Sequence, residues 1–154
     1  MFRACLKDYF IYFNPKEKVS GDFYWAYQNE NIAIWTAADC TGHGVPGAFM
    51  SLITSNILNE SFDDQISQYN PAKMLEYLRR EISERVSQNV SDKINDGLDI
   101  ALICYDKEKR TIEYVNANRP LYIISNNELI TLASENVSIG GLSHKRQLSD
   151  GNRI

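Results

Sequence analysis

Strand-like runs of apolar residues lie toward both ends of this sequence, and two stretches with helical spacing lie between them. Residues 19–27 and 32–38 form two strand-like runs joined by the polar segment 28–31, a pattern that predicts a β-hairpin. Further strands are predicted at residues 9–13, 98–105, 111–116, 121–125 and 129–132. The tail, residues 142–154, is polar and carries no regular pattern.

The first helix is predicted at residues 46–59, because Pro46 suits a first helical turn, where its missing N–H would be unpaired. The apolar stripe expected to face the core is Val45, Ala48, Phe49, Leu52, Ile53 and Ile57. A second helix is predicted after Asn70, an N-cap followed by proline, with the stripe Met74, Leu75, Leu78, Ile82 and Val86. Strands, two helices and then strands predict an α+β fold with helices packed on antiparallel sheet.

Composition narrows the class of protein. The chain has 154 residues, 44% of them apolar, which predicts a single domain over residues 1–154. A net charge of −4 argues against a nucleic-acid partner, and no apolar run is long enough to form a membrane segment. The three cysteines are far apart, which argues against a disulfide framework and favours a reducing, cytoplasmic location.

Two carboxylates supply the candidate chemistry. Asp22 lies inside the first strand of the predicted hairpin, and Asp39 ends the second strand just before a glycine-rich turn. A hairpin can bring them side by side with no obvious cationic partner, and a hard divalent cation would relieve their repulsion. Only two histidines are present, which favours Mg²⁺, Mn²⁺ or Ca²⁺ over zinc.

Each of these features also has a plainer interpretation. A strand aspartate often only caps a helix or closes a turn. Cys40 precedes a helix and could be a reactive thiol, or simply a small residue that fills the turn. Residues 41–47 could bind a nucleotide at the helix N-terminus, although the sequence lacks the Gly-x-x-x-x-Gly-Lys-Ser/Thr pattern of a P-loop.

Five segments together resemble the metal-dependent serine/threonine protein phosphatases, and most of all their bacterial branch named after the stage II sporulation protein E phosphatase. They are GDFY (21–24), ADCTGHGVPGA (38–48), NDGLDIAL (95–102), NANRPLY (116–122) and IGG (139–141), in the same order as in that branch. The resemblance extends over residues 9–141.

The resemblance implies a four-layer α-β-β-α sandwich, with two antiparallel sheets face to face and helices on both outer faces. It implies two Mn²⁺ or Mg²⁺ ions held by Asp39 as a bridging ligand, by Asp22, and by the backbone carbonyl of Cys40. The implied reaction is hydrolysis of phosphoserine or phosphothreonine on a protein, by in-line attack of a metal-bound water. His43 is then either a general acid or a turn residue that hydrogen-bonds locally.

The resemblance also bears on partners and on weaker candidates. It implies a phosphoprotein substrate of the anti-sigma-antagonist type, and a place as the cytoplasmic output domain of a larger sensor. Asp96 and Asp99 lie near a third metal position of some members, although both also suit a turn and a strand start. Asn118 and Arg119 either face the substrate phosphate or shape the crossover between strands, and the second role is favoured.

The sequence departs from the family pattern near its C-terminus. The family places further metal-binding aspartates after the Ile-Gly-Gly step, and no matching segment follows here. Residues 149–151 read Ser-Asp-Gly but lack a preceding apolar strand, so we interpret them as a chance match. We therefore expect the C-terminal part of the domain to be missing. The alternative function is a weak or inactive module that binds a phosphoprotein or self-associates as a homodimer through an exposed sheet edge.

Overall fold

The described residues form an α+β arrangement of two helices and two antiparallel sheets. The computed structural model describes residues 6–15, 17–42, 44–63, 69–87, 97–134, 138–140 and 151–154. The helices are α1 (Gly44–Asp63) and α2 (Pro71–Ser87). The strands are β1 (Asp22–Gln28), β2 (Ile32–Cys40), β3 (Gly97–Asp106), β4 (Thr111–Ala117), β5 (Leu121–Ser125), β6 (Glu128–Leu132), β7 (Ile139–Gly140) and β8 (Asn152–Arg153).

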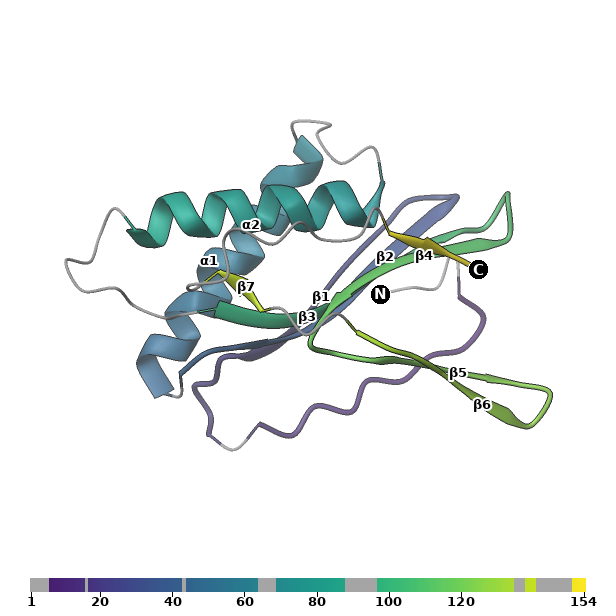
Figure 1. The fold of residues 1–154 in the computed structure, drawn as a ribbon, viewed down its shortest axis with the longest axis horizontal. Helices are drawn as coiled ribbons and strands as arrows, with labels where there is room; N and C mark the ends of the chain where they lie inside the picture. Colours follow the sequence, from purple (N-terminus) through teal and green to yellow (C-terminus); the bar gives the residue numbers. More distant parts are fainter. Residues whose placement is uncertain are drawn as a thin grey trace.

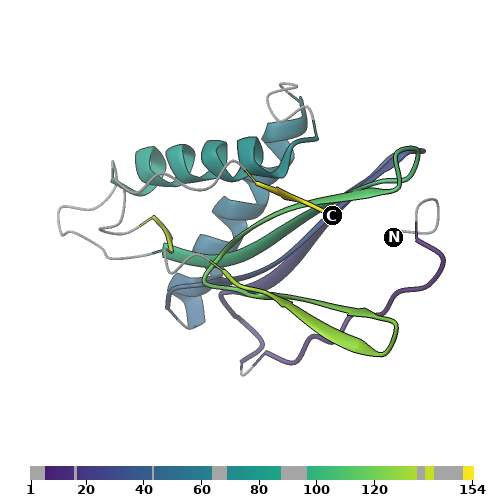
Figure 2. The same ribbon diagram turned by 45° about the vertical axis from the view of Figure 1, so that its right-hand side comes forward.

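The main sheet has the strand order β1-β2-β3-β4-β8, with β7 paired to β3, and β5 and β6 form a separate hairpin. Both helices lie on one face of the main sheet, and the N-terminal segment and the β5–β6 hairpin lie on its other side (Figures 1 and 2). The predicted α+β class with two antiparallel sheets is confirmed. The prediction placed helix layers on both outer faces. The described residues contain one of these layers, which is formed by α1 and α2.

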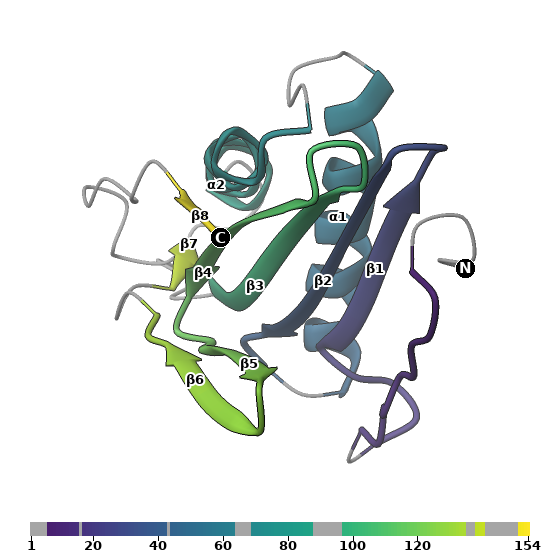
Figure 3. The ribbon, with the colours of Figure 1, turned by 90° about the vertical axis from the view of Figure 1, so that its right-hand side faces the viewer.

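Figure 3 shows both helices on one side of the main sheet, and the buried core residues come from these helices and from the strands that they cover. Side chains alternate across each strand, so residues such as Ile34 and Leu102 face the helices while their sequence neighbours face away. Trp25 on β1 joins the core and donates from Nε1 to Asn59 Oδ1 on α1 at 2.8 Å. The largest fully buried side chains are Ile34, Ile57, Leu58, Met74, Leu75, Leu78, Ile82, Leu98, Ile100, Leu102, Val115 and Ile139.

The face of α1 that packs on the sheet is only partly the one predicted, because Ile57 is fully buried and Ile53 packs against the core, whereas three other predicted residues are exposed. Val45, Phe49 and Leu52 are 62%, 62% and 61% exposed. The buried residues of this helix are Gly47, Met50, Thr54, Ile57, Leu58 and Ser61. Apolar residues surround this helix on all sides, so its pattern does not select one face. Tertiary packing selects the face with Gly47, where the backbone can approach its neighbours most closely.

The prediction for α2 is confirmed at its start and over the described part of its buried stripe, and the Val86 side chain lies outside what the structure describes. The Asn70 side chain accepts a hydrogen bond from the backbone N–H of Lys73 at 2.9 Å, which is the geometry of an N-cap. Met74, Leu75 and Leu78 are fully buried, as expected from their spacing. Neither of the described helices is long and apolar enough to span a membrane.

Two predictions for the ends of the chain were wrong. Residues 9–13 run beside the sheet without forming a strand, and Phe10 and Tyr12 are 90% and 83% exposed. The tail was expected to be irregular, yet Asn152 and Arg153 pair with Tyr114 and Glu113 of β4. Both differences arise because strand formation depends on an available partner edge, which local residue pattern does not reveal.

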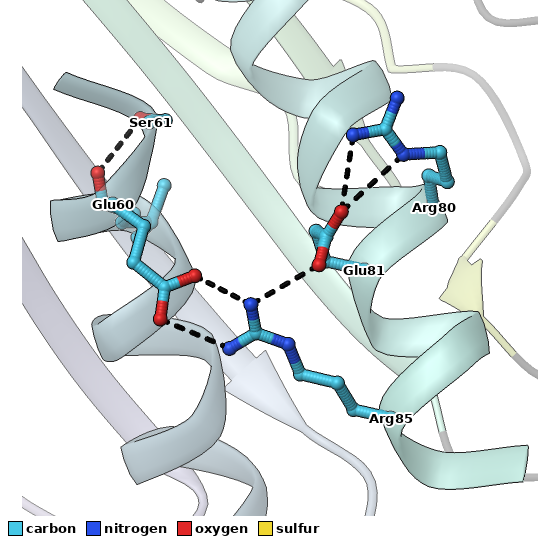
Figure 4. Close-up of polar contacts among 6 residues, drawn as sticks. Glu60, Ser61, Arg80, Glu81 and Arg85 are labelled. Carbon is cyan, nitrogen blue, oxygen red and sulfur yellow. Dashed lines mark hydrogen bonds and ion pairs between the residues drawn. The ribbon is translucent and has the colours of Figure 1, made fainter. Parts of the chain in front are cut away.

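An ion pair joins the two helices at their exposed ends. Arg85 of α2 donates to both carboxylate oxygens of Glu60 on α1, at 3.1 and 2.5 Å, and to Glu81 Oε2 at 3.1 Å (Figure 4). Glu81 also accepts hydrogen bonds from Arg80. The hydrogen bond from Arg85 lowers the pKa of Glu60 below its ordinary value, so ionised Glu60 stabilises the folded state.

We expect Glu60→Gln to destabilise the protein by about 0.5 kcal/mol, and by no more than about 1 kcal/mol, because the Glu60 and Arg85 side chains are 42% and 38% exposed and solvent screens the pair. The loss of stability in Glu60→Gln should be present at neutral pH. It should vanish as pH falls through the lowered pKa of Glu60, because the wild-type carboxylate is then protonated and loses the same charge. Chemical denaturation across pH measures it. Glu76→Gln, which breaks a pair within α2 only, is the control, and an equal loss in both variants would contradict a link between the helices.

Candidate functional site

The β1–β2 hairpin places Asp22 directly opposite Asp39. The paired register runs from Gln28↔Ala33 at the turn to Asp22↔Asp39 at the far end. Asn29 fixes this register, because its side-chain oxygen accepts hydrogen bonds from the backbone N–H groups of Asn31 and Ile32 at 3.0 and 2.8 Å. Residues directly opposed in such a pair have Cβ atoms about 4.5–5.5 Å apart, on the same face. The predicted juxtaposition of the two acids is confirmed.

A third carboxylate continues the row on the next strand. Asp39 of β2 is paired with Asp99 of β3, so Asp22, Asp39 and Asp99 stand side by side across three neighbouring strands. All three lie on the face away from the helices, because their neighbours Cys40 and Leu98 belong to the core. We name this set the aspartate row.

The aspartate row is a line and not a cluster. Strands two apart are separated by about 9–10 Å, so Asp22 and Asp99 lie on opposite sides of Asp39 and apart from each other. Accordingly, the described ranges contain no group of three His, Cys, Asp or Glu side chains that could hold a metal ion. A cation beside Asp39 would therefore take one or two carboxylates from this face and need further oxygen ligands.

Two glycines bring the turn that follows Asp39 close to the helix and to β1. A Cβ atom on Gly21 would lie 2.6 Å from the Cys40 carbonyl oxygen, and one on Gly47 would lie 2.5 Å from the Gly42 carbonyl oxygen. Side chains at either position are excluded by these backbone atoms. The turn is also tied to β3, since Thr41 N–H donates to the Gly97 carbonyl at 2.8 Å. The end of β2 is thus held from both sides.

Cys40 ends β2, and its thiol belongs to the core. It is 2% exposed, and burial raises the pKa of its thiol to about 12. A thiol with such a pKa is protonated at neutral pH and is a poor nucleophile. The structure therefore favours the packing role over the reactive one. The predicted metal contact through its backbone carbonyl stays a prediction.

Asp39 has a cationic partner, contrary to the expectation that neither acid would have one. An Nη atom of Arg119 donates to Asp39 Oδ2, and the two side chains are 44% and 46% exposed. Arg119 follows β4, in the segment for which a role in shaping the crossover was favoured. No local signal marks this contact, because it joins residues 80 positions apart in the chain.

The electrostatics of Asp39 reflect both its neighbours and its surroundings. Burial raises the pKa of its carboxyl above the ordinary value, the Arg119 guanidinium lowers it, and the carboxylates of Asp22 and Asp99 raise it again. The net effect is a raised pKa, of which burial is the largest cause and the two neighbouring carboxylates are a further cause.

The face that carries Asp22 and Asp39 borders a cavity of about 1090 Å³. Its floor includes Trp35 and Ala37 of β2, the N-terminal segment forms one wall, and Pro120 and Tyr122 line it beside Arg119. Phe13 meets Tyr24 edge-on at a ring separation of 5.5 Å, which anchors the N-terminal segment over β1. The predicted acids therefore open onto a largely aromatic groove.

Several predicted residues cannot be placed. His43, Asp96 and residues 149–150 lie outside the described residues, so the general-acid role of His43 stays a prediction. Asp99 was weighed for a third metal or as the start of a strand; it lies in β3 next to Asp39, and the metal role stays a prediction. Sequence pattern could not reveal this, because the two helices separate β2 from β3 and leave their register open.

Comparison with known proteins identifies the family. The sequence profile of the family described as stage II sporulation protein E (SpoIIE) matches residues 30–149, more than half of the chain. This chain belongs to the SpoIIE family. The SpoIIE match contains Asp39, Asp99 and Arg119, and it begins after Asp22. No curated protein sequence matches this chain.

Solved structures share the fold of this SpoIIE-family chain at low sequence identity. The SiaA-PP2C domain of Pseudomonas aeruginosa has a TM-score of 0.78 and 22% identity, over 91% of this chain and 52% of that one. The PP2C phosphatase domain of SpoIIE from Bacillus subtilis has a TM-score of 0.68 and 18% identity, over 90% and 37%. The catalytic domain of the phosphatase PstP, solved with two manganese ions, has a TM-score of 0.59 and 14% identity, over 90% and 66%. This chain thus spans about half the length of the SiaA chain.

Proposed function

We propose that this domain is a metal-dependent phosphatase that hydrolyses phosphoserine or phosphothreonine on a regulatory protein. The observation that carries the proposal is the aspartate row on the open face of the sheet, in a chain of the SpoIIE family. Similar folds occur in serine/threonine phosphatases, and one of them binds two manganese ions. A phosphorylated regulator as substrate and partner, and a cytoplasmic location as part of a larger sensor, belong to the same proposal.

The residues present suit Mn²⁺ or Mg²⁺ by their chemistry. Asp22 and Asp39 offer hard carboxylate oxygens from neighbouring strands, which are the ligands that these cations prefer. In this proposal Asp39, Asp22 and the Cys40 backbone carbonyl would hold the cations, with Asp22 acting directly or through a water. Bound cations of this kind polarise phosphoryl oxygens and lower the pKa of a coordinated water.

The remaining described residues position these groups. The Asn29 turn fixes the hairpin register, and Gly21 and Gly47 let the turn after Asp39 lie against β1 and α1. Arg119 presents guanidinium donors in the same cavity, where donors of this shape match phosphate oxygens. Backbone pairing therefore holds both acids in place, because it fixes the Cα positions of Asp22 and Asp39.

The competing function is a phosphatase-fold module with little or no turnover, which binds a phosphoprotein or a second copy of itself. Two observations favour it: the described residues lack a three-ligand metal cluster, and Arg119 is bound to Asp39. Under this alternative the aromatic groove would still bind its partner, and added metal would change nothing.

Hydrolysis of p-nitrophenyl phosphate and of a phosphothreonine peptide, with Mn²⁺ and with a chelator, separates the two functions. We expect Mn²⁺-dependent hydrolysis in wild type and a loss of about 10- to 100-fold in Asp22→Asn, as for groups that support a metal site. Asp106→Asn is the matched control, because this carboxylate ends the same β3 strand that carries Asp99 and pairs with Lys109. Equal rates in wild type and Asp22→Asn would contradict the enzyme proposal.

A further inference from the structure

The turn that carries Arg119 is held in place by its own side chains. Asn118 adopts a left-handed conformation with φ of 54°, which asparagine tolerates better than most residues. Its amide donates to Asp99 Oδ1 at 3.0 Å and to Ser138 Oγ at 2.8 Å. Ser138 Oγ also donates to Asp99 Oδ1 at 2.7 Å, and Asn116 Nδ2 donates to the Arg119 carbonyl at 2.8 Å.

These bonds fix the Arg119 backbone without using its guanidinium. Asp99, one of the two outer acids of the aspartate row, accepts the hydrogen bond that holds the turn. Asp39, the central acid, accepts the hydrogen bond from the Arg119 guanidinium. The two acids thus have different roles in this fold: one holds the segment and the other takes its charge.

The Asp39–Arg119 contact contributes little to stability. Both side chains are nearly half exposed, and ion pairs with that exposure have a small net effect on folding. The contact does, however, place one positive charge at the centre of three neighbouring carboxylates. Its main consequence is therefore local, at the Asp39 carboxylate itself.

We propose that Arg119 is a positioning residue that competes with a divalent cation for the Asp39 carboxylate and so sets the metal affinity of this site. The inference rests on the metal-dependent function proposed above. A guanidinium and a divalent cation both need the outward-facing oxygens of Asp39, and their like charges repel each other at this distance. Cation binding therefore displaces the guanidinium, which stays in the cavity because the turn keeps its backbone in place.

Mn²⁺ binding to the 154-residue protein, followed by the EPR signal of free Mn²⁺, tests the proposal. We expect Arg119→Gln to bind Mn²⁺ about three- to tenfold more tightly than wild type at low salt, since one competing charge is removed. The difference should shrink at about 0.5 M salt, because exposed charges are screened. Arg119→Lys, which keeps the charge, should stay close to wild type.

Arg80→Gln is the matched control, because it removes one arginine charge from α2, on the opposite side of the sheet. Asp39→Asn should abolish the high-affinity component in every background. In wild type, the Arg119 side-chain N–H signal should move toward that of a free arginine when Mg²⁺ is added, which tests displacement without any substitution.

Equal or weaker Mn²⁺ binding in Arg119→Gln would overturn the proposal, as would the same gain in Arg80→Gln, or no binding in either protein. The outcome is separate from that of the proposed function. A protein that shows the affinity shift but hydrolyses no phosphoester would sustain the role of Arg119 and contradict only the enzyme.

Discussion

Replacing Asp39 with asparagine should abolish Mn²⁺-dependent phosphatase activity, with a loss of more than about 100-fold in kcat/KM. Asp39 is the central acid of the row and the only one paired with a carboxylate on each side. An amide of the same shape keeps the strand register but removes the charge that both neighbours and a cation would share. Steady-state kinetics with Mn²⁺ and Mn²⁺ titration by EPR measure the two losses.

The same substitution should not destabilise the fold. The pKa of Asp39 is raised in the folded state, first by burial, so its charged form is disfavoured relative to the unfolded chain. Stability from this group is complete below the unfolded pKa of about 4 and is lost as pH rises through the higher folded pKa. In the presence of a chelator, Asp39→Asn should therefore be as stable as wild type at acidic pH and more stable than wild type as pH increases.

Thermal unfolding from pH 4 to 8 measures this difference, with Asp106→Asn as control. The hydrogen bond from Lys109 lowers the pKa of Asp106, so Asp106→Asn should lower stability at neutral pH. This effect is opposite to the one expected for Asp39→Asn. A lower melting temperature for Asp39→Asn at pH 8 than for wild type would show that Asp39 is a structural ion-pair residue, in conflict with a functional role for its charge.

Gly47→Ala should lower stability by about 1–3 kcal/mol, although glycine-to-alanine changes inside helices usually stabilise by about 0.5–1 kcal/mol. The added Cβ would lie 2.5 Å from the Gly42 carbonyl oxygen and 3.1 Å from the Gly21 backbone nitrogen. Backbone lies on both sides, so neither neighbour can rotate away. Relief requires a shift of the turn after Asp39, and Mn²⁺ binding should weaken together with stability.

Asn56→Ala, at an exposed position of the same helix, isolates helix propensity and should stabilise the protein by a few tenths of a kcal/mol. Urea denaturation of both variants gives the comparison. A Gly47→Ala protein as stable as wild type would mean that α1 can move away from β1, and that the close approach of backbone at this point is not required.

Much of the site could be predicted because it depends on neighbours in the chain. Asp22 and Asp39 belong to one hairpin whose short turn and alternating side chains fix which residues are opposed. Asn70 could be recognised as a helix cap for the same reason, since its hydrogen bond reaches only three residues ahead. Predictions failed where a pattern was compatible with more than one packing, as for the apolar α1 helix and residues 9–13.

The sequence by itself determined the class of fold, the hairpin and the pairing of Asp22 with Asp39. Local turn geometry and side-chain alternation allow only one register for this hairpin. Only the tertiary structure decided that Asp99 joins the row and that Arg119 contacts its central acid, Asp39. Those contacts join β2 to β3 and to the segment after β4 across two helices. Their register depends on how the core packs, which no local pattern records.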